Sequence, residues 1–245
     1  LTSGTFDEKI YMEYFECPED SFLDIVGSSF PIEDRFTKFD VSDWFNYVVD
    51  LTEKLHVDNV ADIVEDKLFR DILIFVSGGG QIKKIRDAIH LLNTKVFSQG
   101  IEYAKKHSET QQKKYKLGGK EPKTKTEYYI CPISVMSEDM QKGAEDYQNL
   151  FSNIATVTVP IYEFTEEGER TEKIIKYVPA SRRVMIGTNA VETGLTIDTL
   201  RYCIDTGMVN ESQFNPNFGA GVLANKNVTQ ASSRQRRGRV GRKDP

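Results

Sequence analysis

The sequence is poor in cysteine and has no long hydrophobic run. Its 245 residues include three cysteines, Cys17, Cys131 and Cys203, which stand far apart. This spacing excludes a cysteine-based metal cluster and a disulfide framework, and it favours buried free thiols in a reducing compartment. No apolar stretch approaches the roughly 20 residues that a membrane-spanning helix needs, so we expect no membrane partner.

The N-terminal stretch "LTSGTFDEKI" has neither a basic start nor an apolar segment. These features of a secretory signal peptide are missing, and we therefore expect an intracellular, cytoplasmic protein. The stretch also lacks an initiating methionine. We expect the chain to be a fragment of a longer polypeptide.

Charge is distributed unevenly along the chain. Acidic residues outnumber basic ones by 37 to 32, which gives a formal net charge of −5. Residues 1–71 are strongly acidic, whereas residues 95–125 and the last dozen residues are rich in lysine and arginine. An acidic protein with local basic regions is expected to meet a polyanion at one surface rather than over its whole surface.

Short apolar segments alternate with helical patterns, and this order predicts an α/β fold with a mostly parallel sheet. Apolar runs rich in β-branched residues, such as "DILIFV" at 71–76, are typical of buried parallel strands. We predict further strands at 22–26, 30–39, 127–133, 182–188 and 200–207, and hairpins at 154–178 and around 213–223. We predict helices at 41–55, 58–69, 82–115 and 138–151, and a last one that begins near Thr229.

The C-terminal stretch "QRRGRVGR" (235–242) combines arginines with glycines. On a helix, Gln235, Arg239 and Arg242 would share one face, and two fork-shaped guanidinium groups suit a polyphosphate. Gly238 and Gly241 would each cost a helix about 1 kcal/mol relative to alanine, so they indicate a close approach of the backbone to another group. The alternative is a disordered basic tail or a localisation signal.

Two polar loops directly follow predicted core strands. The loop "GTNAVETGLTID" spans residues 187–198, and the turn "SGGG" spans residues 77–80. Ligands of open α/β sheets bind at the carboxyl ends of the strands, and helix N-termini present free N–H groups to anions. Both segments are therefore candidate binding loops. The alternative for each is an ordinary connection between a strand and a helix.

Taken together, these stretches resemble the motifs of a known enzyme family. "TNAVETGLTI" followed by "QRRGRVGR" strongly resembles motifs V and VI of the superfamily-2 helicases, and most closely their DEAH/DExH branch, which includes viral RNA helicases. "DILIFVSGGGQIKKI" is similar to motif IV, and "CPISVMSEDMQ" stands where motif IVa would be. The opening "LTSGTFDEKIYMEYF" looks like motif III and the helix after it, so the resemblance covers nearly the whole chain.

The resemblance implies a second RecA-like domain at residues 28–245, with a lysine-rich insertion near 93–126. Residues 1–27 would be the end of the first RecA-like domain and a linker. The sequence contains no G-x-x-x-x-G-K-[ST] loop and no Asp-Glu-x-His box. The parts that hold ATP or another NTP with Mg²⁺ are therefore expected upstream, in the first domain of the same polypeptide. The chain by itself is expected to be inactive.

Residue roles follow from the resemblance, position by position. It implies that Arg239 and Arg242 are arginine fingers, and that Gln235 lies near the γ-phosphate and the attacking water. No metal ligand is implied in this chain. The nucleotide pocket would include Gly194, Thr196 and Asp198, and the coupling motif III would include Ser3 and Thr5. Contacts to the RNA backbone would come from Ser77, Gly78, Ser134, Thr188 and Asn189.

Some positions depart from the pattern of cellular DEAH proteins. Those proteins usually have serine at the position of Gly194, and alanine at the positions of Arg237 and Val240. The residues found here look more like those of viral DExH helicases, which favours a virus-encoded protein. Two other functions stay open: a DNA helicase or translocase of the same superfamily, and a non-catalytic nucleic-acid-binding module. The lysines of 93–126 either contact nucleic acid or belong to a solvated loop.

Overall fold

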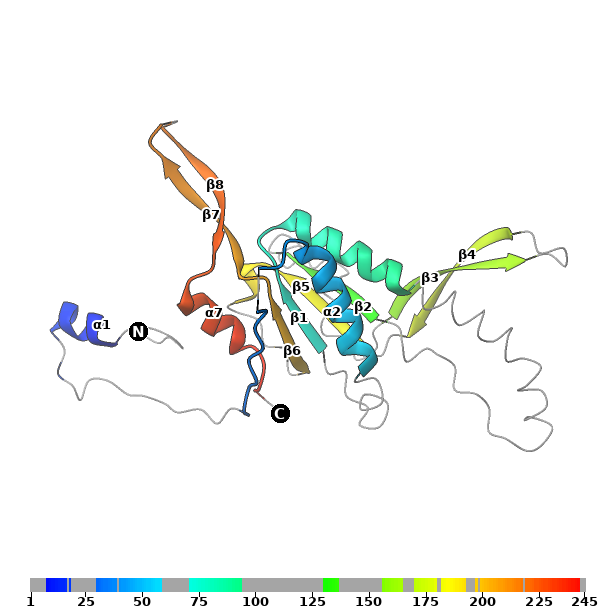
Figure 1. The fold of residues 1–245 in the computed structure, drawn as a ribbon, viewed down its shortest axis with the longest axis horizontal. Coiled ribbons are helices and arrows are strands. Elements are labelled where there is room, and N and C mark those ends of the chain that lie inside the picture. Colours follow the sequence, from blue (N-terminus) through cyan, green and yellow to red (C-terminus); the bar gives the residue numbers. More distant parts are fainter. Residues whose placement is uncertain are drawn as a thin grey trace.

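The structure, a computed structural model, describes residues 8–16, 18, 30–38, 40–58, 71–93, 130–136, 156–164, 170–179, 182–192, 197, 199–217 and 219–242. Its centre is a four-stranded sheet in the order β2-β5-β1-β6 (Figure 1). All three strand pairs are parallel, which confirms the predicted α/β class. The strands are β1 (Asp71–Phe75), β2 (Ile130–Val135), β5 (Arg182–Gly187) and β6 (Leu200–Asp205).

Helices cover one face of the sheet. The helix α2 spans Trp44–Asp58, and a second helix occupies residues 79–93. The predicted apolar face of this second helix is buried, since Ile82, Ile85 and Ile89 are all 0% exposed. They pack with α2 against alternate residues of the strands, and this contact forms one of the two apolar cores. Every residue of β1 is buried, as expected for a strand covered on both faces.

The second core lies on the other face of the sheet. It contains Leu73 and Phe75 of β1, Met185 of β5 and two residues from loops, Val191 and Val240. These loop residues come from "TNAVETGLTI" and "QRRGRVGR". The two stretches are therefore held against the sheet by apolar packing and do not form a free tail.

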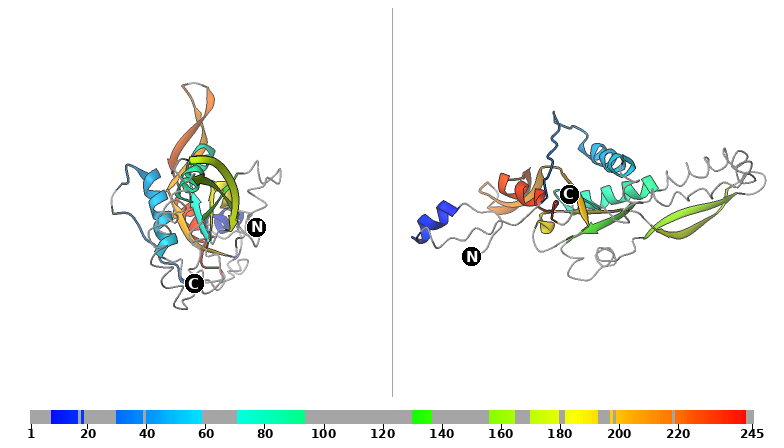
Figure 2. Two further views of the ribbon diagram at one scale, coloured as in Figure 1. Left: turned by 90° about the vertical axis from the view of Figure 1, so that its right-hand side faces the viewer. Right: turned by 90° about the horizontal axis from the view of Figure 1, so that it is seen from below.

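Two antiparallel hairpins project from different ends of the sheet (Figure 1, Figure 2). The strands β3 (Thr156–Phe164) and β4 (Arg170–Pro179) form the first hairpin, as predicted from the sequence. The strands β7 (Met208–Asn215) and β8 (Ala220–Asn227) form the second, which is longer than the predicted 213–223. The second hairpin carries exposed apolar side chains, those of Phe214 (71%) and Leu223 (68%).

Several predicted elements differ from the structure or fall outside it. Residues 30–38 form no strand, although the sequence predicted one over 30–39. Instead, the N–H of Phe30 donates to the carbonyl of Gly241 near the C-terminus. The helix α1 spans Glu8–Phe15. The predicted strand at 22–26, the predicted helix at 138–151 and most of the predicted helix at 58–69 lie outside the described residues, as does the second helix beyond 93. Among the helices that the structure describes, none has the length and apolar character needed to cross a membrane.

Candidate functional site

The candidate site lies at the carboxyl edge of the parallel sheet. Because β1 and β5 are parallel neighbours, the loops that follow them begin side by side. A hydrogen bond joins the two strand ends, from the N–H of Val76 to the carbonyl of Gly187 at 2.9 Å. The predicted loop at 77–80 and residues 187–192 of the predicted loop at 187–198 therefore begin at the same edge, as expected for an open α/β sheet.

The turn after β1 is held by local hydrogen bonds. The N–H and the hydroxyl of Ser77 both donate to Oε1 of Gln81, each at 2.9 Å. Gly78 lies beneath the side chain of Asn210 in β7, and a Cβ at this glycine would be 2.8 Å from Asn210 Nδ2. A side chain at position 78 would therefore displace the end of the Asn210 side chain from the turn.

The loop after β5 begins with a short capped turn. Residues Asn189–Val191 form the 3₁₀ helix η3, and the Thr188 hydroxyl accepts a hydrogen bond from the N–H of Ala190. Thr188 is partly buried and Asn189 is exposed. Their position at the sheet edge leaves Asn189 open to a ligand.

Ser134, which was predicted to contact the RNA backbone, is buried in the sheet. It lies within β2 and is 0% exposed. Its hydroxyl accepts a long hydrogen bond, 3.5 Å, from Nη1 of Arg86 in the helix at 79–93. The alternation of side chains along β2 turns it toward the helix at 79–93, and its predicted contact with RNA stays a prediction.

Arg236 is the central buried charge of the site, and no role was predicted for it from the sequence. Its side chain is 0% exposed, and Nε donates to Oε1 of Glu192 at 2.6 Å. Nη1 donates to Oδ1 of Asp205 at 2.8 Å and to the carbonyl of Met208 at 3.3 Å. The guanidinium also lies 4.9 Å from the ring centroid of Phe75. Only the fold brings Glu192, after β5, and Asp205, at the end of β6, to the same guanidinium.

The helix α7 (Gln230–Arg237) begins as predicted but ends earlier. Thr229 is its N-cap, and its hydroxyl accepts from the N–H of Ser232 at 3.1 Å. Gly238 caps the C-terminus, and residues 238–242 form a turn, which we call the C-terminal turn. The prediction that Gln235, Arg239 and Arg242 share a helical face is therefore wrong, because only the first of these three residues is helical.

The C-terminal turn nevertheless brings Arg239 to the loop after β5. Nη2 of Arg239 donates to the backbone carbonyl of Glu192, whose carboxylate binds Arg236. Partial burial, followed by the nearby charge of Arg242, lowers the pKa of Arg239, and the charge of Glu192 opposes that change. The two arginines are therefore close enough to interact, and an anion placed near them would relieve their repulsion.

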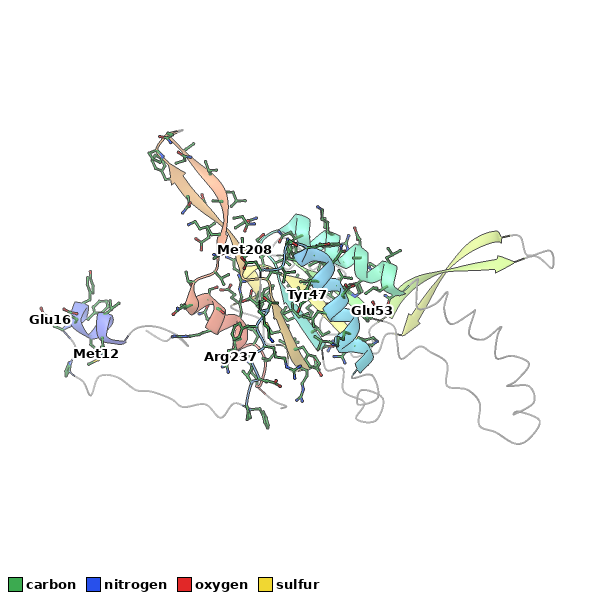
Figure 3. The ribbon with its side chains drawn as sticks, viewed as in Figure 1. Met12, Glu16, Tyr47, Glu53, Met208 and Arg237 are labelled. Carbon is green, nitrogen blue, oxygen red and sulfur yellow. The ribbon has the colours of Figure 1, made fainter. Side chains whose placement is uncertain are left out.

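The opposite side of the C-terminal turn contacts the extended segment at residues 30–34. The N–H of Phe30 donates to the carbonyl of Gly241 at 2.8 Å. Arg237 donates from Nε to both carboxylate oxygens of Asp34, at 2.8 and 2.9 Å. Figure 3 shows Arg237 at the end of α7, beside this segment. Gly241 has a φ of +70°, and a Cβ there would be 2.8 Å from Cγ1 of Ile32.

A second buried ion pair lies at the amino edge of the sheet, away from these loops. Arg183 at the start of β5 donates from Nη2 to Oδ2 of Asp71 at 2.8 Å, and Asp71 also accepts from the Thr199 hydroxyl. The pair joins the starts of β1 and β5 to residue Thr199, just before β6. It stabilises the sheet and takes no part in the candidate site.

The remaining predicted site residues lie outside the part of the chain that the structure describes. Their predicted roles in nucleotide binding and in coupling stay predictions. They are Ser3 and Thr5 near the N-terminus, and Gly194, Thr196 and Asp198 in the loop after β5.

Comparison with known proteins extends these observations. Residues 132–244 match the family model of the helicase conserved C-terminal domain. The chain is 28% identical over 245 residues to a protein of African swine fever virus named as an RNA helicase, covering 100% of this chain and 21% of that protein. It is 27% identical over 246 residues to the pre-mRNA-splicing factor ATP-dependent RNA helicase prp22 of Schizosaccharomyces pombe, covering 100% of this chain and 16% of that protein.

A solved structure also superposes on the whole chain. The DExH-box NTPase HrpB of Escherichia coli gives a TM-score of 0.49 with 18% identity, covering 100% of this chain and 22% of that one. The chain thus spans about a fifth of the length of the proteins it matches. The family match includes both the loop after β5 and the C-terminal turn. Residues 132–244 thus match the conserved C-terminal domain of helicases, and over its whole length the chain is similar to proteins named as RNA helicases.

Proposed function

We propose that this chain is the second RecA-like domain of an NTP-dependent RNA helicase, and that it supplies arginine fingers to NTP hydrolysis. Residues 28–245 would form this domain, and residues 1–27 would be the end of the first domain and the linker. The relatives named as RNA helicases favour RNA as the nucleic-acid partner. The first RecA-like domain of the same polypeptide would be the second partner.

The link between Arg239 and the backbone of Glu192 is the observation that supports the proposal most strongly. It joins the C-terminal turn to the loop after β5 at the carboxyl edge of the sheet. Burial lowers the pKa of Arg239 and the positive charge of Arg242 lowers it further, so negative charge placed beside the two arginines would be stabilising. A polyphosphate would supply that charge, and the planar guanidinium groups match its oxygens.

The residues of this chain suit a nucleotide whose phosphates reach the edge of the domain. ATP or another NTP with Mg²⁺ supplies the phosphoryl group that is transferred to water, and the upstream domain would hold most of it. Arg239 and Arg242 would neutralise charge on the transferred group, which in well-studied NTPases accelerates hydrolysis roughly 10³- to 10⁵-fold. Gln235 would orient the attacking water. Gly194, Thr196 and Asp198 would contact the nucleotide from the loop after β5.

RNA would lie along the same edge of the sheet, on the two strand-end loops. Ser77, Gly78, Thr188 and Asn189 all lie at this edge, and they are small or uncharged polar residues. Such residues contact phosphate and sugar without distinguishing bases, which suits an enzyme that moves along any sequence. Ser134 would support this surface from below, since it is buried. Ser3 and Thr5 would couple the RNA surface to the nucleotide.

The test is NTP hydrolysis by the full-length polypeptide with and without RNA. We expect RNA to stimulate hydrolysis, and we expect the 245-residue chain alone to hydrolyse NTP negligibly. Unwinding of RNA and DNA duplexes by the same preparation distinguishes an RNA helicase from a DNA translocase. Helicase-like hydrolysis by the isolated chain, or a full-length polypeptide that binds RNA but hydrolyses no NTP, would overturn the proposal.

A further inference from the structure

Residues 30–34, which we call the strap, contact the C-terminal turn and the end of α7 on both sides of Arg239. Asp34 accepts from Nε of Arg237 at 2.8 and 2.9 Å. The carbonyl of Ile32 accepts from Nη2 of Arg237 at 3.3 Å. Beyond Arg239, the N–H of Phe30 donates to the carbonyl of Gly241 at 2.8 Å. The strap is therefore fixed to the residues two before and two after Arg239.

Apolar packing supports these polar contacts. Ile32 packs against the same core cluster as Val240 of the C-terminal turn. Gly241 has a left-handed φ of +70°. A Cβ at this position would be 3.0 Å from the carbonyl oxygen of Phe30 and 2.8 Å from Cγ1 of Ile32. The absence of a side chain at Gly241 thus allows the strap to lie directly on the turn.

The Asp34–Arg237 pair is the adjustable part of this contact. The two side chains are 42% and 47% exposed, so the pair is hydrated and its formation is reversible. By contrast, the ion pair of Arg236 with Glu192 is 0% and 9% exposed and belongs to the rigid site. The turn is thus held firmly on its sheet side and adjustably on its strap side.

We propose that Asp34 and Arg237 are positioning residues, which hold the strap on the C-terminal turn and so fix the direction of Arg239 and Arg242. This inference rests on the proposed function, in which those two arginines contact the nucleotide. The strap lies at the start of the proposed second domain, directly after residues 1–27, which are assigned to the end of the first domain and the linker. A movement of the first domain would therefore act directly on the turn that bears the fingers.

The test uses the full-length polypeptide and exchanges the charges of the pair. Four proteins are compared: wild type, Asp34→Arg, Arg237→Asp and the double variant with both changes. We expect each single reversal to lower kcat about tenfold and to change KM for NTP and the Kd for RNA less than about twofold. We expect the double variant to recover kcat to within about twofold of wild type, since it restores the pair with opposite polarity.

A matched control is available one residue away. Glu33 pairs with Arg35 at 2.9 Å on the exposed side of the strap, so Glu33→Arg makes the same charge change as Asp34→Arg without touching Arg237. We expect Glu33→Arg to keep the kcat of wild type. If a charge-reversed variant does not fold, Asp34→Asn replaces it, because asparagine has the shape of aspartate without the charge. We expect its kcat to lie between those of wild type and Asp34→Arg.

The outcomes separate this inference from the proposed function. If wild type shows no RNA-stimulated hydrolysis, the proposed function fails and the positioning role fails with it. If wild type is active but the double variant remains as slow as the single variants, the positioning role alone is overturned. Equal kcat values for Asp34→Arg and Glu33→Arg would also overturn it.

Discussion

Arg236 and Glu192 form a buried ion pair in which Nε lies 2.6 Å from Oε1, and their side chains are 0% and 9% exposed. The same guanidinium binds Asp205 at 2.8 Å and lies over the ring of Phe75. One side chain of α7 thus connects the loop after β5, the ends of β1 and β6, and the base of the second hairpin through Met208. Its removal would break all of these connections at once.

Replacing Glu192 with glutamine should destabilise the chain strongly. The change leaves a fully buried guanidinium facing a neutral amide, and breaking one partner of a buried pair costs about 3 kcal/mol or more. Urea denaturation of the chain measures the loss. Glu211→Gln is the matched control, because Glu211 pairs with Lys226 at 3.4 Å with exposures of 50% and 35%. That control should lose less than about 1 kcal/mol. Similar losses in the two variants would show that the Arg236 pair contributes little.

The central sheet was predictable because its strands are short apolar runs. "DILIFV" and "RRVMIG" are covered on both faces, so their burial is enough to predict that they form strands. The strand predicted at 30–39 failed for a related reason. Its alternation of apolar and polar residues suits a strand, but a strand also needs an edge to pair with. This segment instead contacts the C-terminal turn, where the N–H of Phe30 donates to the carbonyl of Gly241.

The candidate site was predicted less completely than the sheet. The sequence located the two loops at the carboxyl edge, since the ends of parallel strands share one edge. It extended α7 through Arg242, whereas Gly238 caps the helix and Gly241 takes a positive φ. It also gave no role to Arg236, because a fully buried arginine looks in sequence like any exposed one. Only the three-dimensional position of Glu192 and Asp205 distinguishes it.

Gly241→Ala should destabilise the contact between the strap and the C-terminal turn. Alanine at a φ of +70° costs of order 1 kcal/mol or more, and its Cβ would be 2.8 Å from Ile32. Gly207→Ala isolates the first of these effects, because Gly207 has a φ of +71° but nothing within 4 Å of a Cβ. We expect Gly241→Ala to lose about 1–3 kcal/mol more than Gly207→Ala in urea denaturation. Equal losses would mean that the strap moves away from the added methyl group without lowering the stability of the chain.

Gly78→Ala should weaken RNA binding with little effect on stability. A Cβ at Gly78 would be 2.8 Å from Nδ2 of Asn210, the end of a flexible side chain that can move aside. The methyl group and the displaced amide would then cover the turn after β1. We expect a several-fold loss of affinity for all RNA sequences alike, as for a backbone contact.

Gly80→Ala is the control for this change, because a Cβ there meets nothing within 4 Å. RNA titrations at about 50 and 200 mM salt check both variants, and all proteins should bind more weakly at the higher concentration. Loss of affinity in Gly80→Ala, or a sequence-dependent loss in Gly78→Ala, would contradict the assignment of this turn to the RNA backbone.

Arg242→Ala should abolish most NTP hydrolysis in the full-length polypeptide and leave RNA binding nearly unchanged. Arg242 is exposed on the C-terminal turn, where Nε donates to the carbonyl of Gly238 at 3.0 Å, and its charge lowers the pKa of Arg239. A group that acts on the transition state affects kcat more than nucleotide affinity, and a loss of about 10³-fold is expected for a finger. Arg242→Lys should stay defective, because one ammonium group does not reproduce the planar fork.

Arg237→Ala provides the comparison within the same stretch. Its guanidinium is engaged by Asp34 on the strap side, away from the loop after β5, so kcat should fall only several-fold. Steady-state kinetics, RNA titration and a melting curve on the same variants separate catalysis from folding. If Arg242 only stabilises the fold, Arg242→Ala will melt early and lose RNA binding in parallel with activity. If Arg237→Ala lowers kcat as much as Arg242→Ala while both proteins stay folded, the fingers are assigned to the wrong residues.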